Sequence, residues 1–227
     1  KGYVWGRHHE FISSPHLDDL QCAYTTLQGF LQGHSRRSLN VYCCFDNEEV
    51  GSTTKQGAAS DFLKETVFRI CRESGMDELE RSRVMASSFM VSADNAQAAH
   101  PNHMEKSDAV NRPFMNEGIV IKYNANQRYT SDGVSSAIFK MICEKAGVPY
   151  QVYVNRSDIA GGSTLGNIAG TQISMNTVDI GLAQLAMHSS YETAGAKDTE
   201  YLVKAAKQFF ESNIQCAEDG YTLSREA

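Results

Sequence analysis

The sequence has only four prolines in 227 residues, and no apolar run reaches the roughly 18 to 20 residues of a membrane-spanning helix. It also lacks low-complexity tracts, internal repeats and linker-like segments. Its hydrophobic share of 41% and charged share of 21% are those of an ordinary globular protein. These features exclude a disordered, collagen-like or membrane-helix protein. We therefore expect a single domain over residues 1–227 and no membrane partner.

Positive charge is also scarce. The chain has 21 Lys and Arg against 27 Asp and Glu, which gives a formal net charge of −6. Proteins that bind nucleic acid through its phosphates usually present a basic surface, and no long basic run occurs here. We therefore expect no nucleic-acid partner.

Six cysteines are present, and none has the C-x-x-C spacing of a thiolate metal site. Cys43 and Cys44 are adjacent, so in a strand they would point to opposite faces and could not easily pair. We expect buried free thiols in a reducing cytoplasm. The chain starts at Lys1 with no targeting segment after it, so we also expect it to begin inside a longer gene product.

The apolar spacing alternates between a strand period and a helix period along the chain. A nearly continuous apolar run at 39–45 is typical of a strand that is covered on both faces. This alternation predicts an α/β domain with three layers, α/β/α, around a mostly parallel mixed sheet. The predicted helices are 17–33, 58–71, 134–146 and 198–210, and the predicted strands are 39–45, 87–92, 119–123, 148–154 and 177–180.

Two acidic clusters adjoin these elements. Asp18 and Asp19 open the first helix, where a helix-capping role is the simpler interpretation. Asp46, Glu48 and Glu49 follow the apolar run at 39–45, and three carboxylates so close together repel one another. A divalent cation explains this second cluster better than a surface loop, because one Glu can ligate the metal while its neighbour acts as a base.

Two further residues complete the candidate site. Asp94 follows the strand at 87–92, where a turn-forming role is the usual one, and His188 lies in an apolar stretch, where a buried hydrogen-bonded histidine is the usual one. Taken together, carboxylates with one imidazole and no thiolate suit a hydrolytic site with two metals. We expect these residues to meet at the strand ends of one sheet.

Several strings resemble the aspartyl aminopeptidase family of zinc metallopeptidases, and the resemblance runs from about Glu10 to about Phe210. It implies a cytoplasmic enzyme with a zinc-peptidase (phosphorylase/hydrolase-like) α/β/α fold. The strings are SPHLDDL at 14–20, FDNEEVGS at 45–52, SADNA at 92–96 with HPN at 100–102, GIVIK at 118–122, GGSTLG at 161–166 and DIGLAQLAMHS at 179–189.

The resemblance implies a role for each matching position. Asp18 would bridge two zinc ions, Glu49 and His188 would complete the ligands of one ion, and Asp94 would bind the other. Glu48 would be the general base of a metal-activated water. Co²⁺ or Mn²⁺ would be the possible substitutes for zinc.

The resemblance also implies substrate contacts. Lys122 would pair with an acidic substrate side chain, although a solvent-exposed strand-end lysine is the plain alternative. His100, Gly162 and Ser163 are the other expected substrate-binding residues. The expected reaction is release of N-terminal residues, acidic ones preferred, from peptides with a free N-terminus.

Two departures from the family, besides His16 in place of its arginine and Gln97 in place of a frequent histidine, bear on the metal site and on assembly. The family has a metal-ligating histidine in a His-x-Asp motif well upstream of the bridging aspartate, and no such motif precedes Asp18 at that distance. The domain that the family inserts for oligomerisation is absent as well. We therefore expect the carboxyl-terminal part of a catalytic domain whose full-length form is a homo-oligomer. The alternative is a truncated noncatalytic fragment or assembly scaffold with an incomplete metal site.

Overall fold

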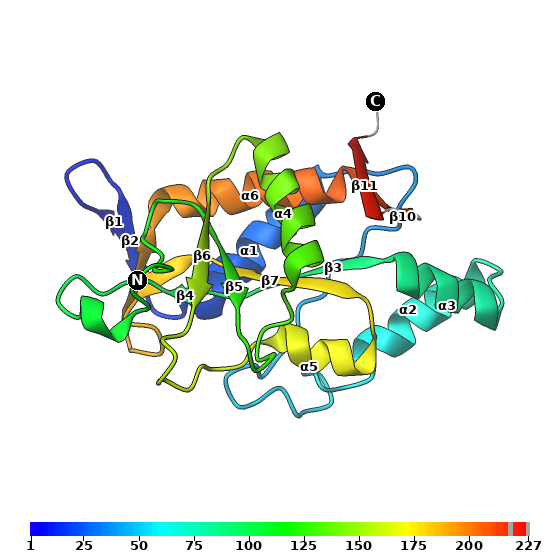
Figure 1. Cartoon of the computed structure of the whole chain (residues 1–227), viewed down its shortest axis with the longest axis horizontal. Coiled ribbons are helices and arrows are strands. Elements are labelled where there is room, and N and C mark those ends of the chain that lie inside the picture. Colours follow the sequence, from blue (N-terminus) through cyan, green and yellow to red (C-terminus); the bar gives the residue numbers. More distant parts are fainter. Residues whose placement is uncertain (218–219, 226–227) are drawn as a thin grey trace.

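A computed structural model describes residues 1–217 and 220–225 of the chain (Figure 1). Short strands and helices alternate along most of it. The helices are α1 (Leu17–Gln32), α2 (Phe62–Glu73), α3 (Glu78–Ser87), α4 (Gly133–Ala146), α5 (Leu165–Gln172) and α6 (Ala196–Phe210), with one 3-10 turn at Met104–Lys106. The strands are β1 (Tyr3–Trp5), β2 (Phe11–Ser14), β3 (Phe89–Ala93), β4 (Ala96–Gln97), β5 (Ile119–Tyr123), β6 (Tyr150–Val154), β7 (Asn176–Gly181), β8 (Ala183–Leu185), β9 (Glu192–Gly195), β10 (Ser212–Ala217) and β11 (Gly220–Arg225).

A four-stranded sheet in the order β3-β7-β5-β6 forms the centre of the fold. The β3/β7 and β5/β6 pairs are parallel and the β5/β7 pair is antiparallel. Ile121 and Ile180 on one face pack with Phe139 of α4 and Leu202 of α6, while α5 contacts β3 and β7. Figure 1 shows α1 and α6 on the side of this sheet opposite α5. The predicted three-layer fold with a mostly parallel mixed sheet is confirmed.

A second sheet, in the order β1-β2-β9-β8-β4, adjoins the first. The β3/β7 pairing continues into it, because Ala96 N donates to Leu182 O at 2.8 Å and Ala98 N donates to Gln184 O at 2.8 Å. The sequence predicted a single sheet, so this division was not expected. Its strands have two to four residues, too few for an alternating apolar pattern to be recognised.

Three predicted helices, α1, α4 and α6, are confirmed to within two residues at each end. The ends of α4 follow from local chemistry: the Asp132 side chain accepts from Val134 N and Ser135 N, and Gly147 closes the helix in the left-handed conformation. The helix predicted from residue 58 begins at Phe62 instead, because Ser60 N donates to Gly57 O in a turn.

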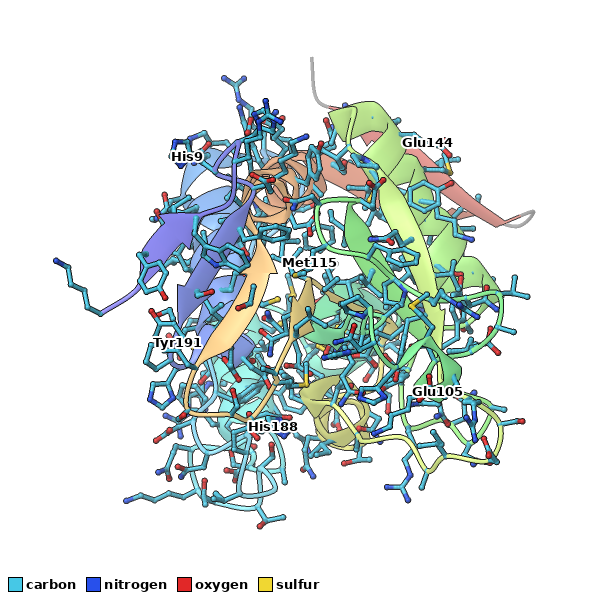
Figure 2. The ribbon with its side chains drawn as sticks, turned by 90° about the vertical axis from the view of Figure 1, so that its left-hand side faces the viewer. His9, Glu105, Met115, Glu144, His188 and Tyr191 are labelled. Carbon is cyan, nitrogen blue, oxygen red and sulfur yellow. The ribbon has the colours of Figure 1, made fainter. Side chains whose placement is uncertain are left out.

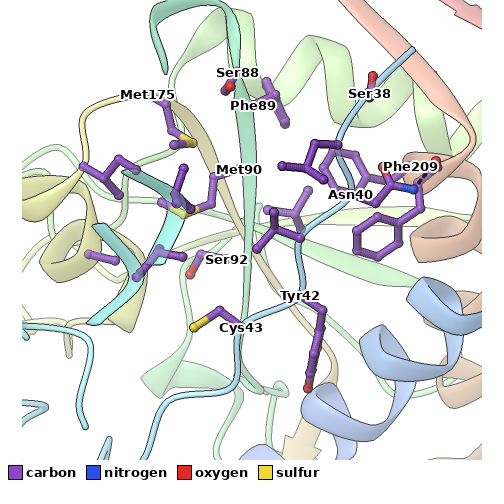
Figure 3. Close-up of a pocket in the computed structure, with 18 of the residues that line it drawn as sticks. Ser38, Asn40, Tyr42, Cys43, Ser88, Phe89, Met90, Ser92, Met175 and Phe209 are labelled. Atoms are coloured by element: carbon purple, nitrogen blue, oxygen red, sulfur yellow. Dashed lines mark hydrogen bonds between the residues drawn. The ribbon is translucent and has the colours of Figure 1, made fainter. Parts of the chain in front are cut away.

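The strand predicted at 39–45 is wrong. These residues have no regular secondary structure, and none of their backbone groups makes a backbone hydrogen bond to the described residues. Leu39 is 65% exposed despite its apolar side chain. The apolar residues follow the pattern of a buried strand. Among the described residues, however, no strand lies beside this segment to form backbone hydrogen bonds with it (Figure 3).

All six cysteines are free thiols, as predicted. Cys22, Cys71 and Cys143 are buried, whereas Cys44 and Cys216 are exposed, so the expectation of burial is only partly confirmed. Within the described residues, no helix combines the length and apolar character needed to cross a bilayer.

Candidate metal centre

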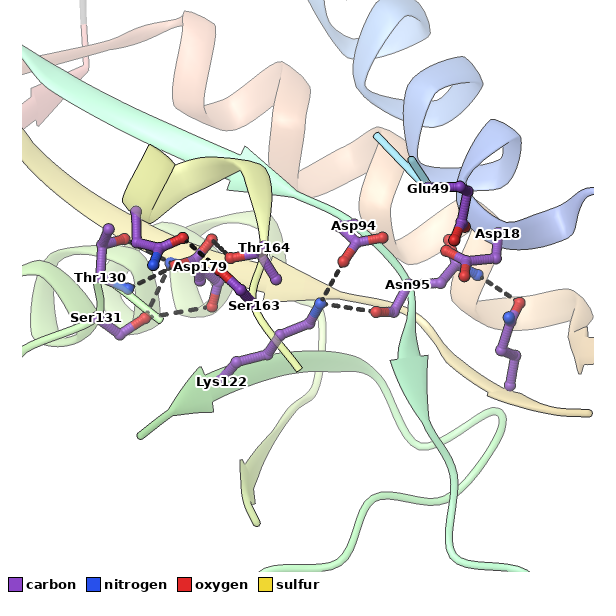
Figure 4. Close-up of polar contacts among 12 residues, drawn as sticks. Asp18, Glu49, Asp94, Asn95, Lys122, Thr130, Ser131, Ser163, Thr164 and Asp179 are labelled. Atoms are coloured by element: carbon purple, nitrogen blue, oxygen red, sulfur yellow. Dashed lines mark hydrogen bonds and ion pairs between the residues drawn. The ribbon is translucent and has the colours of Figure 1, made fainter. Parts of the chain in front are cut away.

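Three of the predicted ligands converge from separate segments. Asp18 opens α1 and Glu49 lies in the loop before α2 (Figure 4), and His188 lies between β8 and β9 (Figure 2). One potential ligand atom from each residue lies within 4.8 Å of the others. His188 Nε2 is 3.1 Å from Asp18 Oδ2 and 3.2 Å from Glu49 Oε2. Donors on a tetrahedral zinc lie about 3.4 Å apart when each bond is about 2.1 Å, so this donor set fits zinc.

Glu192 holds two of these residues in place. Its buried carboxylate accepts from Asp18 N at 3.0 Å through Oε2 and from His188 N at 2.8 Å through Oε1. The backbone at His188 is left-handed, with φ 65°. Glu192 was not predicted from the sequence, because a single acidic residue at the start of a short strand gives no motif.

Asp94 lies beside this group, although it follows β3 of the other sheet. It lies close enough to raise the pKa of Asp18 through charge repulsion. Asp94 Oδ2 also accepts from Lys122 Nζ at 3.1 Å (Figure 4). The predicted residues thus meet where the two sheets join, instead of at the strand ends of a single sheet.

Lys122 is 2% exposed and is already paired within the protein. Besides Asp94, it donates to Asn95 O at 2.7 Å, and its Nζ lies 5.7 Å from the centre of the Tyr129 ring. Burial lowers the pKa of Lys122, but attraction from Asp94, Tyr129 and Asp179 outweighs burial and raises it above its ordinary value. The lysine therefore stays charged beside Asp94.

The carboxyl groups around the centre repel one another. Burial, followed by Asp94 and Glu49, raises the pKa of Asp18 to about 9. Burial, followed by Asp94, Glu49 and Asp19, raises the pKa of Glu48 to about 7, and burial with Asp94 raises that of Asp19 to about 6. A bound cation would relieve this repulsion, so the electrostatics also fit a metal.

Glu48 lies next to Glu49, the predicted ligand, in a tight loop. Gly51 N donates to Glu48 O at 2.9 Å, and Ser52 N donates to Asn47 O at 3.0 Å. These bonds fold residues 47–52 back on themselves. The Glu48 side chain is half-buried and is not one of the three converging donors.

A buried amide network supports the junction beneath the centre. Asn95 Nδ2 donates to Gln21 Oε1 at 3.0 Å and to Gln184 Oε1 at 2.9 Å, which links α1, the end of β3 and β8. Gly181 is packed so tightly there that an added Cβ would lie 2.0 Å from Asp94 O. This close approach explains why glycine occupies position 181.

The glycine-rich loop is held by Asp179 of β7. Asp179 accepts from Thr130 N at 2.6 Å, Thr130 Oγ1 at 2.9 Å and Thr164 Oγ1 at 2.9 Å (Figure 4). Gly162 and Ser163, the predicted substrate contacts, are exposed next to this anchor. The third, His100, is exposed with its ring 5.2 Å from that of His103, and it is not among the three converging donors.

Comparison with known families gives a match over residues 1–210 to the family described as aminopeptidase I zinc metalloprotease (M18). A probable M18 family aminopeptidase 2 of Clostridium acetobutylicum is 47% identical over 210 residues, which cover 92% of this chain and 48% of the relative. Aspartyl aminopeptidase 1 of Schizosaccharomyces pombe is 40% identical, covering 93% and 46%. The chain thus spans about half the length of the curated relatives it matches.

Solved structures agree with this match. One chain in the structure of the Ape4 and Nbr1 complex matches with a TM-score of 0.86 and 41% identity. The match covers 92% of this chain and 41% of that one. The S. cerevisiae mApe1 dodecamer gives a TM-score of 0.76 at 28% identity, covering 92% and 48%.

Proposed function

Because the chain belongs to the M18 family of zinc aminopeptidases, we propose that it supplies the metal-binding and proton-transferring part of a metallo-aminopeptidase site. The observation that carries the proposal is the convergence of Asp18, Glu49 and His188 to within 4.8 Å. Asp94, whose charge helps raise the pKa of Asp18, is the proposed ligand of a second zinc ion.

The chain's own residues divide the work of peptide hydrolysis. Zinc, when bound, supplies Lewis-acid polarisation of the scissile carbonyl. The Glu48 carboxylate takes a proton from the attacking water and delivers it to the leaving amine. Its pKa of about 7 suits a group that must both accept and release a proton near neutral pH. Lys122 holds Asp94 by its ion pair, which keeps that ligand oriented.

We propose a peptide substrate with a free N-terminus, with acidic N-terminal residues preferred. The support is the name of the Schizosaccharomyces pombe relative, an aspartyl aminopeptidase. Lys122 is the proposed partner of the acidic side chain, and this role requires it to share its charge with Asp94. His100, Gly162 and Ser163 are the proposed contacts to the rest of the peptide.

Assembly and location are part of the same proposal. A homo-oligomer of the full-length protein is supported by the dodecamer formed by a structural relative. A cytoplasmic location is supported by six unpaired cysteines, since thiols persist in reducing compartments.

A noncatalytic fragment or assembly scaffold is the second candidate. Two observations favour it: the chain spans about half of its relatives' length, and no His-x-Asp motif precedes Asp18 at the family's distance. On this view the chain retains part of the metal site and little activity.

Metal content and turnover together distinguish the two candidates. Zinc, cobalt and manganese bound to the purified 227-residue chain are measured by mass spectrometry, and cleavage of aspartyl- and leucyl-p-nitroanilide is followed. Zinc-dependent cleavage by the chain alone would exclude the second candidate, a noncatalytic fragment or scaffold. Cleavage only after co-expression with the remainder of the Clostridium acetobutylicum relative supports a divided site. Absence of zinc binding and of cleavage in both samples would overturn the proposal.

Glu48→Gln tests the proton transfer in whichever of these samples is active. The variant keeps the size of the side chain but cannot accept the proton. We expect turnover to fall about 10²- to 10⁴-fold with zinc content unchanged. Glu78→Gln, an exposed glutamate on α3 that is not among the three converging donors, is the control. Normal turnover in Glu48→Gln would remove Glu48 from the role of base.

A further inference from the structure

The loop at residues 98–118, which joins β4 to β5, folds back on itself. Ala99 N donates to Pro113 O at 2.8 Å, so the two ends of the loop lie side by side. The structure describes the whole loop, and its regular structure is limited to the 3-10 turn at Met104–Lys106. Long loops of this kind are uncommon in compact domains and are frequently functional. This loop is therefore a good place to look for a binding site.

A tight turn brings two histidines of the loop together. His103 N donates to His100 O at 2.9 Å, which closes a β-turn over residues 100–103. Pro101 takes the second position of this turn, where its fixed φ is favourable, and Asn102 is a common turn residue. The centres of the two imidazole rings are 5.2 Å apart. The turn therefore holds the two rings close together through local backbone chemistry.

This spacing suits two ligands of one metal ion. On a tetrahedral zinc with Zn–N bonds of about 2.1 Å, the ring centres of two ligating imidazoles lie about 5 Å apart. Both histidines are exposed, so an ion can reach them without any opening of the fold. A plain contact between two rings gives a similar distance, so the orientation of the ring nitrogens has to distinguish the two interpretations.

Glu105 holds His103 as carboxylates hold metal-binding histidines. Glu105 Oε1 is 3.2 Å from His103 Nδ1. A carboxylate in this position accepts the Nδ1–H, which leaves the lone pair of Nε2 free to bind a metal. His100 Nδ1 accepts from Asn102 N at 3.2 Å, and this long, exposed bond is easily displaced. The orientation of His103 therefore favours a metal site.

A neighbouring loop fixes Glu105 in turn. Arg156 donates through Nη1 to Glu105 O. The same guanidinium is paired with Asp158, since Arg156 Nη2 lies 2.5 Å from Asp158 Oδ2. This pairing offsets the positive charge that would otherwise repel a cation. The histidine loop is thus attached to a second segment of the chain beside the two rings.

We propose that His100 and His103 form a two-histidine site for a divalent transition-metal ion that prefers imidazole, namely Cu²⁺, Ni²⁺ or Zn²⁺. Glu105 positions His103, and water completes the coordination. Neither histidine belongs to the three-residue group of the candidate metal centre, and Figure 2 shows Glu105 and His188 at different places on one face. The site does not depend on the aminopeptidase proposal, although a metal on His100 would exclude the peptide contact proposed for that side chain.

Copper binding tests this site directly. The untagged 227-residue chain carries Asp18→Asn and His188→Gln, so the candidate metal centre cannot compete. Cu²⁺ affinity is measured by calorimetric titration, and its ligands are identified from the nitrogen hyperfine pattern in electron paramagnetic resonance. We expect one tightly bound Cu²⁺ with two imidazole nitrogens. Zn²⁺ should displace it only in excess, because Cu²⁺ binds nitrogen ligands more tightly.

Removal of either histidine should nearly abolish binding, because the second ligand of a chelate acts at a high effective concentration. We expect His100→Ala and His103→Ala each to lower Cu²⁺ affinity at least 100-fold and to leave one imidazole nitrogen in the spectrum. Glu105→Gln keeps both ligands. It should lower the affinity about 10-fold with the two-nitrogen pattern retained, which distinguishes a positioning residue from a ligand.

His8→Ala combined with His9→Ala is the matched control. These two histidines are adjacent and exposed in the loop between β1 and β2, and this variant should bind Cu²⁺ as the parent chain does. Equal affinity in all variants, a loss of binding in this control, or a one-nitrogen spectrum in the parent would overturn the proposal.

The stability of each variant is checked by its Tm without metal. Because the four histidines are exposed, this Tm should be the same throughout, and glutamine replaces alanine in any variant whose Tm is lower. None of these measurements involves peptide cleavage, and the candidate metal centre is disabled in every sample. Failure of the aminopeptidase proposal and failure of this one are therefore distinguishable.

Discussion

At the scale of single residues, the sequence predicted the three side chains that converge but not the residue that holds two of them in place. Asp18, Glu49 and His188 stand in local strings whose chemistry is readable without a fold. Glu192 acts through a backbone contact with Asp18 that spans 174 residues of sequence, and nothing in its own neighbourhood marks it. Contacts of this kind depend on tertiary structure, so sequence patterns cannot show them.

Glu192→Gln tests this positioning role. The amide keeps one acceptor oxygen but turns its NH₂ toward a backbone N–H, so either Asp18 or His188 loses its support. We expect zinc affinity to fall about 10- to 100-fold, as measured by calorimetric titration of the chain. Glu78→Gln, an exposed glutamate on α3, is the control and should bind zinc normally. Unchanged affinity in Glu192→Gln would leave it a purely structural residue.

At the scale of elements, long helices and buried strands were predictable and the joints between them were not. The α4 boundaries follow from Asp132 and Gly147, which act on the adjacent backbone. By contrast, Asp198 in the first turn of α6 accepts from Asn116 N and Gly118 N at 2.6 and 2.9 Å, across about 80 residues. It joins the loop before β5 to the start of α6.

Asp198 makes the stability of the fold depend on pH. Burial raises its pKa from 3.8 to about 6, although the two backbone N–H groups act in the opposite direction. The folded state therefore binds more protons than the unfolded state between pH 4 and 6, so stability falls as the pH rises through this window. We expect the free energy of unfolding, relative to Asp198→Asn, to decrease by about 2 to 3 kcal/mol from pH 4 to pH 7. Urea unfolding of both proteins measures this difference, and a constant difference would contradict it.

Gly181 tests the junction of the two sheets. Alanine at this position would bring its Cβ to 2.0 Å from Asp94 O and 2.9 Å from Lys122 Cε, so the backbone at Asp94 must move. We expect Gly181→Ala to lower the free energy of unfolding by about 1 to 3 kcal/mol and to weaken zinc binding. Gly170→Ala in α5, where nothing lies within 4 Å, should instead raise stability by up to about 1 kcal/mol. Equal effects of the two substitutions in thermal unfolding would rule out this account.

At the scale of the whole molecule, the layers of the fold were predicted correctly and one central element was not. Residues 39–45 carry the pattern of a central strand, but a strand requires a neighbouring backbone as well as a suitable sequence. Among the described residues, no strand pairs with residues 39–45. The local sequence therefore predicts a strand that the structure does not contain. Residues 39–45 lead directly into Glu48 and Glu49. The position of this segment beside the sheet therefore affects where these two carboxylates lie in the site.

We expect the candidate metal centre to stabilise this molecule only when a cation occupies it, because its carboxyl groups otherwise repel one another. Asp18, with its pKa raised to about 9, is the most affected. Zinc at about 100 times its dissociation constant should stabilise the chain by about 2.7 kcal/mol, which corresponds to a rise in Tm of about 5 to 10 °C. In Asp18→Asn, we expect the Tm without zinc to be unchanged or higher, because the amide resembles the protonated acid, and the rise with zinc to disappear. Scanning calorimetry with zinc and with a chelator measures both values. A zinc-dependent rise that persists in Asp18→Asn would mean that the metal binds elsewhere on the chain.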